Sequence, residues 1–357
     1  MSNGIYIHIP FCLAKCAYCD FNSYAGKLDM ADSYIEALIT EMKSFKGLSA
    51  DTVYIGGGTP TVLSEKQLEK LITFVNENFV LSRDTEFTVE SNPATASVEK
   101  YRLLKSLGVN RLSIGVQSFS DDELKALSRV HSGKEAEFAV LDAKKAGFSN
   151  ISIDLMEAIP NQSKESLLMN VDKALNLGVN HISCYSLIIE EGTPFYENTP
   201  KLPTEEEERD MHYAVCERLE KAGFCHYEIS NFGKEGFYSR HNMKYWTGVP
   251  YYGFGAGAHS FYNGTRISNI KSVEEYIKAT DKTEEKIEIS KTEAEYERFM
   301  LGFRILTGFE TKGSFPDKIE ALAEKGLISF DGKIAKLTKK GEDLANLVFM
   351  EFLSEED

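Results

Sequence analysis

The sequence lacks several features that would assign it to a membrane or to nucleic acid. No stretch reaches the ~18 consecutive apolar residues that a membrane span requires. The first residues, MSNGIYIHIP, lack the positive charge and long apolar core of a signal peptide. Lys and Arg number 40 against 55 Asp and Glu, a net charge of −15, which disfavours a phosphate backbone as main partner. We therefore expect a cytoplasmic protein with no transmembrane segment and no nucleic acid among its partners.

Cysteine is scarce, with six residues among 357, and unevenly distributed. Cys184, Cys216 and Cys225 are scattered through apolar stretches. We expect them to be free thiols in a reducing compartment.

The other three cysteines, Cys12, Cys16 and Cys19, lie close together in FCLAKCAYCDF. Disulfide frameworks use cysteines in pairs, and a structural zinc site closes with four ligands. A [4Fe–4S] cluster held by three thiolates leaves one iron open to an added ligand. The spacing C-x3-C-x2-C therefore predicts such a cluster, and a zinc-binding interaction protein is the non-enzymatic alternative.

Four segments repeat one pattern, in which a helical stretch leads through a glycine to a short apolar run: SLGVNRLSIGV, KAGFSNISIDL, NLGVNHISCYSL and KAGFCHYEISNF. Their glycines suit the left-handed position just beyond a helix end; they are Gly108, Gly147, Gly178 and Gly223. Such repeats are typical of successive αβ units that build a parallel sheet.

The repeats predict six strands, each followed by a helix, at about 5–9, 52–56, 86–90, 111–115, 151–155 and 181–187, with a shorter strand at 225–230. A doubly wound sheet and a partial (β/α) barrel both fit this order. Polar or glycine-rich features follow five successive strands. Barrel enzymes gather their sites at the carboxyl ends of many strands, whereas a doubly wound sheet uses one switch point. We therefore expect the barrel.

The regularity stops near residue 235, so we divide the chain into a barrel, residues 1–235, and a C-terminal domain, residues 236–357. The charged stretch 271–312 is expected to be helical. LISFDGKIAKL reads as a hairpin that turns at Asp331-Gly332, and a helix follows in TKKGEDLANLVFMEFL. Helices followed by a small hairpin favour a winged-helix-like module.

Several motifs together resemble the anaerobic coproporphyrinogen oxidase group of the radical S-adenosylmethionine (SAM) superfamily: IYIHIPFCLAKCAYCDF, IGGGTP, ESNP, RLSIGVQSF, LSRVHS and NISIDL. The resemblance implies an α/β fold, a partial (β/α)6 TIM-like barrel with a C-terminal α-helical domain. It also implies that SAM chelates the open iron. An electron donor would reduce the cluster, and the reduced cluster would then break the C5′–S bond of SAM to give a radical.

The resemblance assigns SAM contacts to Tyr6, Gly57, Gly58, Thr59, Glu90, Gln117, Arg129 and Asp154. The two glycines allow the backbone to approach a ligand closely. Glu90, Gln117 and Asp154 could hold the ribose and methionine groups. Arg129 could meet the carboxylate. Tyr18, the aromatic residue before the third cysteine, is expected to cover the cluster, and Asp20 follows it in the same cofactor-binding loop.

Two branches of this group differ in features that the sequence displays. The true oxidases carry a further cysteine two residues after the third, where this chain has Phe21. HemW-type heme chaperones keep three cysteines, end the loop in CDF and carry H-N-x-x-Y-W, which appears here as HNMKYW. LGFRILTGF, residues 301–309, also resembles that branch. The resemblance thus implies a chaperone that passes heme to acceptor proteins, for example respiratory ones. The alternative is an oxygen-independent coproporphyrinogen dehydrogenase.

HNMKYW contains the parts that a heme site requires. His241 could ligate the iron and Asn242 could bond a propionate. Tyr245 and Trp246 could line the macrocycle. His259 is the second candidate for the iron, and His8 is expected to be structural.

One loop departs from the family pattern D-L-I-Y-G-L-P-G-Q, because this chain reads DLMEAIPNQ. Glu157 and Ala158 replace Tyr-Gly, and Asn161 replaces the second Gly. The sequence therefore does not predict the shape of this loop. Because Asp154 is retained, we still expect SAM binding.

Overall fold

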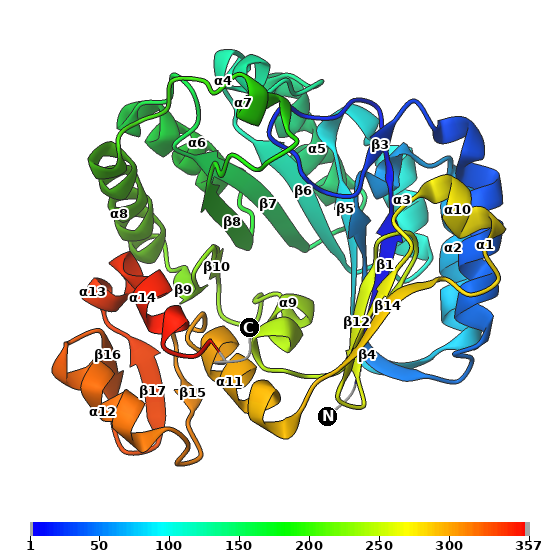
Figure 1. Ribbon diagram of the computed structural model, residues 1–357. Helices are drawn as coiled ribbons and strands as arrows, with labels where there is room; N and C mark the ends of the chain where they lie inside the picture. Colours follow the sequence, from blue (N-terminus) through cyan, green and yellow to red (C-terminus); the bar gives the residue numbers. More distant parts are fainter. Residues whose placement is uncertain (1–2, 354–357) are drawn as a thin grey trace.

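Six parallel strands form the centre of a twelve-stranded sheet in the computed structural model, which describes residues 3–353 (Figure 1). They pair in the order β1 (Asn3–Ile9), β4 (Ser49–Gly57), β5 (Val80–Ser91), β6 (Arg111–Gln117), β7 (Asn150–Glu157) and β8 (His181–Ser186). All six lie where the sequence places strands. In β1, β6 and β7 most side chains are buried, because helices cover the outer face of the sheet.

The covering helices are α1 (Ala31–Lys43), α2 (Glu65–Asn78), α3 (Val98–Ser106), α5 (Gly133–Lys145), α6 (Lys164–Asn176) and α8 (Glu205–Lys221) (Figure 1). Shorter elements at the carboxyl ends of the strands are β2 (Phe11–Cys12), β3 (Tyr24–Ala25), α4 (Asp121–Ala126) and α7 (Pro194–Glu197). The four repeat glycines have φ between +64° and +94°, as expected from their places after α3, α5, α6 and α8.

The sheet stays open, which confirms a partial barrel. Beyond β8 lie β10 (Asn231–Gly233) and β9 (Cys225–Glu228), which run antiparallel. On the other side, β11 (Tyr251–Phe254) runs parallel to β1. It is followed by antiparallel β12 (His259–Tyr262), β13 (Thr265–Asn269) and β14 (Thr283–Glu288). The two outermost strands, β14 and β9, are not paired with each other.

The prediction of one helical stretch over 271–312 is wrong for residues 283–288, which form a strand. Helices α10 (Val273–Lys278) and α11 (Lys291–Gly302) flank β14, the edge strand TEEKIE. β14 supplies the backbone partners that β13 needs. All six of its side chains are exposed, so it lacks the apolar alternation by which a strand is recognised, and its charges protect the edge from further pairing.

A second hydrophobic core lies within residues 296–352, around Phe299, Phe303 and Phe352. It joins α11 to β15 (Phe309–Glu310), α12 (Pro316–Glu324), β16 (Ile328–Phe330), β17 (Ile334–Leu337), α13 (Lys339–Asp343) and α14 (Ala345–Met350). The hairpin β16–β17 forms as expected, followed by helix. The domain boundary at residue 235 stays a prediction. Phe254 and Tyr276, which follow that boundary in the sequence, belong to the core of the large sheet.

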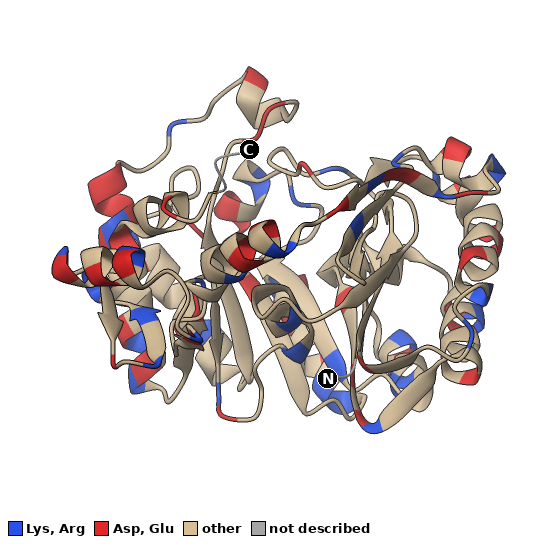
Figure 2. Cartoon of the chain, turned by 60° about the horizontal axis from the view of Figure 1, so that its bottom comes forward, with Lys and Arg blue, Asp and Glu red and all other residues tan. Residues whose placement is uncertain are grey.

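Acidic and basic segments are interspersed along the helices (Figure 2). Among residues 3–353, no helix is both long and apolar enough to cross a membrane.

Candidate radical SAM site

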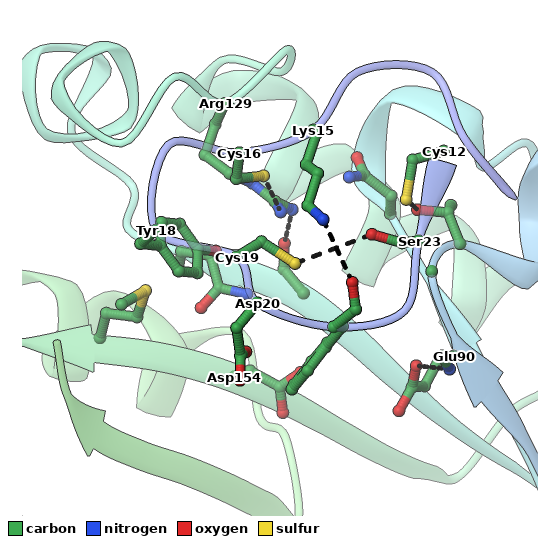
Figure 3. Close-up of a pocket in the computed structure, with 18 of the residues that line it drawn as sticks. Cys12, Lys15, Cys16, Tyr18, Cys19, Asp20, Ser23, Glu90, Arg129 and Asp154 are labelled. Carbon is green, nitrogen blue, oxygen red and sulfur yellow. Dashed lines mark hydrogen bonds between the residues drawn. The ribbon is translucent and has the colours of Figure 1, made fainter. Parts of the chain in front are cut away.

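A cavity of about 400 Å³ opens at the carboxyl ends of the central strands, beneath the cysteine loop (Figure 3). This volume lies in the usual range for small-molecule sites. All three loop cysteines line it. So do Tyr18, Asp20, Gly57, Gly58, Thr59, Glu90, Gln117, Arg129 and Asp154. The structure therefore brings together every SAM residue expected from the sequence except Tyr6.

The three thiols each have a polar neighbour from a different part of the cavity wall. Cys12 Sγ lies 3.5 Å from Thr59 Oγ1 and Cys19 Sγ lies 3.9 Å from Ser23 Oγ. Cys16 Sγ accepts a hydrogen bond of 3.3 Å from Nη1 of Arg129. Burial raises the pKa of the Cys12 and Cys19 thiols, an effect that bound iron would reverse by stabilising the thiolates.

The glycines at the end of β4 leave space for the residues that surround the cysteine loop. A Cβ on Gly58 would lie 2.8 Å from the carbonyl oxygen of Phe11 and 3.0 Å from Cys12 Sγ. Gly57 has φ +112°, and a Cβ there would lie 2.5 Å from the His8 ring. Only glycine fits both places without displacing the loop. Three thiols on one wall, a guanidinium beside them and an open cavity below fit a three-thiolate cluster with a ligand on its open iron.

Glu90 is held by both carboxylate oxygens at the end of β5. The Tyr54 hydroxyl donates to Oε1 at 2.7 Å, and the amide of Gly57 donates to Oε2 at 3.0 Å. Burial, with the nearby charge of Asp154, raises the pKa of Glu90 to about 7. The carboxyl is therefore fixed in place and ready to accept or release a proton near neutral pH.

Asp154 and Gln117 occupy the neighbouring strand ends. Ser113 Oγ donates to Asp154 Oδ1 at 3.4 Å, and burial raises the pKa of Asp154. The Tyr185 hydroxyl donates to Gln117 Oε1 at 3.0 Å. Gln117 has φ +63°, a left-handed conformation at a strand end that turns its side chain toward the cavity.

The cavity also contains residues that the sequence analysis missed. They include Ser113, Met156, Tyr185, Ile188 and Glu190. Tyr185 lies one residue before the end of β8, as Glu90 does in β5, so the rule that selected Glu90 could have found it. Met156 shares a face of β7 with Asp154 through the two-residue strand period. Ile188 and Glu190 lie in the loop after β8, where no sequence signal points to the cavity.

Tyr6 lies away from the cavity wall. Its hydroxyl bonds Nδ1 of His8 at 2.9 Å, and Nε2 of His8 bonds the carbonyl oxygen of Asn22 at 2.8 Å. This pair links β1 to the far end of the cysteine loop, so His8 has the structural setting that we expected.

HNMKYW forms α9 (Arg240–Trp246) at the opposite end of the barrel (Figure 1). Glu86, in the middle of β5, accepts hydrogen bonds from the first two amides of this helix, those of Arg240 and His241. These bonds satisfy donors that a helix N-terminus leaves unpaired. The helix is thereby fixed beneath the strands, away from the cysteine loop.

His241 is only 1% exposed, and both of its ring nitrogens have partners. Nδ1 lies 2.9 Å from Thr52 Oγ1, and Nε2 lies 2.9 Å from the Tyr245 hydroxyl. Burial and the charge of Lys244 lower the pKa of His241 to about 3, which keeps the ring neutral. Trp246 packs beneath the guanidinium of Arg304 at 4.3 Å. None of the four HNMKYW residues expected to bind heme lines the cavity.

Comparisons with known proteins agree with this geometry. The model of the Radical SAM superfamily matches residues 6–174. The solved structure of coproporphyrinogen III oxidase (HemN) from Escherichia coli superposes with a TM-score of 0.86, covering 98% of this chain and 90% of that chain. At 21% identity this likeness is one of fold. The fold and the cysteine loop define a radical SAM protein.

Curated relatives narrow the assignment. Over 98% of this chain and 99% of the relative, the sequence is 42% identical to heme chaperone HemW of Bacillus subtilis. It is 41% identical to HemW of Lactococcus lactis, over 98% of this chain and 97% of that protein. HemW of Escherichia coli is 34% identical, over 99% and 98% respectively. The chain belongs to the HemW family.

Proposed function

We propose that this chain is a heme chaperone that binds heme and delivers it to acceptor proteins. The similarity to proteins named heme chaperone HemW, over nearly the full length of both chains, carries the proposal. The HNMKYW motif and Phe21, which stands where the oxidases have a further cysteine, support the same branch.

The cavity supports a [4Fe–4S] cluster and SAM as resident cofactors. Cys12, Cys16 and Cys19 would hold the cluster, which when bound supplies one electron to the sulfonium of SAM. Arg129 places a positive charge beside Cys16 and is itself held by a 2.7 Å bond from Nη2 to the carbonyl oxygen of Gly115. Glu90 offers a fixed acceptor to the hydroxyl or ammonium groups of SAM.

The mouth of the cavity has an apolar rim. Phe21 is 63% exposed and Ile188 is 67% exposed, and both line the opening. Large exposed apolar side chains beside a cavity are typical of binding surfaces. None of His241, Asn242, Tyr245 and Trp246 lines this opening, so the rim is a surface separate from the proposed heme site on α9.

His241 remains the proposed iron ligand, with Asn242, Tyr245 and Trp246 around the macrocycle. To ligate iron, its ring must exchange the partner at one nitrogen, either Thr52 or Tyr245, for the metal. The exchange also requires α9 to expose the ring. Heme binding at this place therefore includes a local rearrangement of the helix. His259, which is exposed on β12, needs no such step.

The partners that this function requires are an acceptor protein for heme, an electron donor for the cluster and heme itself. We place the chain in the cytoplasm, in agreement with its free cysteines.

The test compares two reactions of the anaerobically reconstituted protein. One contains coproporphyrinogen III, SAM and a reductant; the other contains heme. We expect stoichiometric heme absorbance and no protoporphyrinogen IX. Accumulation of protoporphyrinogen IX over many turnovers would replace the chaperone with the dehydrogenase alternative.

Iron and labile sulfide are counted in the same samples. Any one of the variants Cys12→Ala, Cys16→Ala or Cys19→Ala should abolish them, while Cys225→Ala should keep them.

A further inference from the structure

A second group of metal-ligating side chains lies far along the chain from the cysteine loop, where α8 packs on the edge of the sheet. His212 and Cys216 lie one turn apart on α8, and His226 lies on β9. Cys216 Sγ is 3.5 Å from Nε2 of His212 and 3.8 Å from Nδ1 of His226. The three ligand atoms all lie within 4.8 Å of one another.

The remaining nitrogen of each histidine is already oriented. Nδ1 of His212 donates to Glu157 Oε1 at 2.9 Å. Nε2 of His226 donates to the carbonyl oxygen of Ile229 at 3.0 Å, and its ring stacks on Phe232 at 4.1 Å. When both rings are neutral, this arrangement directs the unprotonated nitrogen of each ring toward the thiol. Burial lowers the pKa of His212, but hydrogen bonds to Cys216 and Glu157 outweigh it and raise the pKa to about 11, so a metal ion would replace a proton on Nε2. Metal-bound histidines are characteristically held by a carboxylate or a carbonyl in this way.

We propose that His212, Cys216 and His226 bind one divalent ion of the zinc class, with Glu157 orienting His212. Zinc–nitrogen bonds of about 2.0–2.1 Å and zinc–sulfur bonds of about 2.3 Å place tetrahedral nitrogen and sulfur ligands about 3.6 Å apart. Both measured sulfur–nitrogen distances lie close to this value. Three protein ligands leave a fourth position for water, and the His212 side chain is 29% exposed, so solvent reaches the site.

The site also accounts for a departure from the family pattern. Glu157 follows Asp154 and Met156 on β7 but points to the other face of the sheet, toward α8. It is 2% exposed, and its oxygens also receive Ser186 Oγ and lie near Cys184 Sγ. A carboxylate buried on this face is costly without a partner, and His212 supplies one. A bound metal would thus fasten α8 to β9 and to the carboxyl end of β7.

The competing account is a hydrogen-bonded group of thiol, imidazole and carboxylate that binds no metal. The test uses protein whose cysteine loop is filled with its iron–sulfur cluster. After dialysis against chelator-buffered zinc, we expect one zinc per chain in addition to the cluster iron. Cys216→Ser and His226→Ala should lose this zinc and keep the iron and sulfide. Glu157→Gln should weaken zinc binding about 10–100-fold.

Matched variants separate the site from others. Cys225→Ser, which changes a cysteine beside His226, and His259→Ala should keep the zinc. The triple variant of Cys12, Cys16 and Cys19 to Ala should also keep one zinc. Cobalt in place of zinc should give a thiolate charge-transfer band in the wild type that Cys216→Ser lacks. Wild-type protein without a second metal, or zinc and the cobalt band retained in Cys216→Ser, would overturn the proposal. Because these readouts involve no heme or SAM, they are independent of the proposed function.

Discussion

The Nε2 nitrogen of His241 and the hydroxyl of Tyr245 lie 2.9 Å apart across one turn of α9. The ring nitrogen that would meet a heme iron thus already has a partner. The Tyr245 hydroxyl and a heme iron would compete for the same Nε2 nitrogen of His241, and this competition can be measured.

Tyr245→Phe removes this partner and leaves the ring in place. A net hydrogen bond contributes about 1 kcal/mol, which corresponds to a several-fold change in an equilibrium constant. If His241 is the iron ligand at Nε2, heme affinity should rise several-fold in this variant, measured by titration of the Soret band. His241→Ala should lose the band, and His259→Ala should leave it unchanged. Unaltered heme spectra in folded His241→Ala protein would instead make His259 the next candidate.

Asp154→Ala removes a buried carboxylate from the SAM cavity. A charge-assisted hydrogen bond contributes roughly 1.5–3 kcal/mol, so SAM affinity should fall about tenfold or more in calorimetry. Asp142→Ala, on the outer helix α5, is the matched control and should bind SAM normally. Unchanged affinity in both Asp154→Ala and Glu90→Ala would remove SAM from this cavity.

Glu90 should make stability depend on pH in cofactor-free protein. Its pKa is about 7 in the fold against an ordinary value of 4.5, so between these values the unfolded chain releases a proton that the folded chain keeps. Its contribution to stability is full below pH 4.5 and is lost as pH rises through about 7. The groups around it are Tyr54, Arg111, Asp154 and the Gly57 amide.

The neutral variant Glu90→Gln isolates this effect. From about pH 5 to about pH 8, wild-type protein should lose on the order of 1–3 kcal/mol of unfolding free energy relative to the variant. Denaturant titrations at both pH values measure the difference. A gap between the two proteins that does not change with pH would show that Glu90 titrates normally.

Asn161 tests the altered loop. It is exposed and has φ +64°, in the region that asparagine and glycine tolerate and a β-branched residue does not. Asn161→Val should lower the unfolding free energy by roughly 1–2 kcal/mol. Asn161→Gly should stay within about 0.5 kcal/mol of the wild type. Equal stability of the two variants in denaturant titration would contradict the left-handed backbone at this position.

The cavity beneath the cysteine loop could be predicted from the sequence because parallel strands bring their carboxyl ends to one edge. Glu90, Gln117 and Asp154 each lie in the carboxyl-terminal half of a strand, so their meeting follows from the topology alone. Tyr6 could not be placed this way, since it lies within β1 and its direction depends on a partner, His8, in the same strand.

The position of α9 could not be predicted from the sequence either. HNMKYW contains an imidazole and aromatic rings, but nothing in it shows which end of the barrel it meets. Glu86 determines the position by capping the helix from the middle of β5, 154 residues earlier in the chain than Arg240. The His212–Cys216 spacing was visible as one helical turn. The third ligand, His226, joins them only because β9 folds back on the sheet edge.

The most direct test of the chaperone assignment is heme transfer. Cluster-loaded protein carrying one heme per chain is mixed with a heme-free globin, and the Soret band of the globin is followed with time. We expect heme to move to the globin and this chain to stay folded and able to bind a second equivalent. Heme that fails to bind this chain specifically, or that never leaves it, would contradict the account.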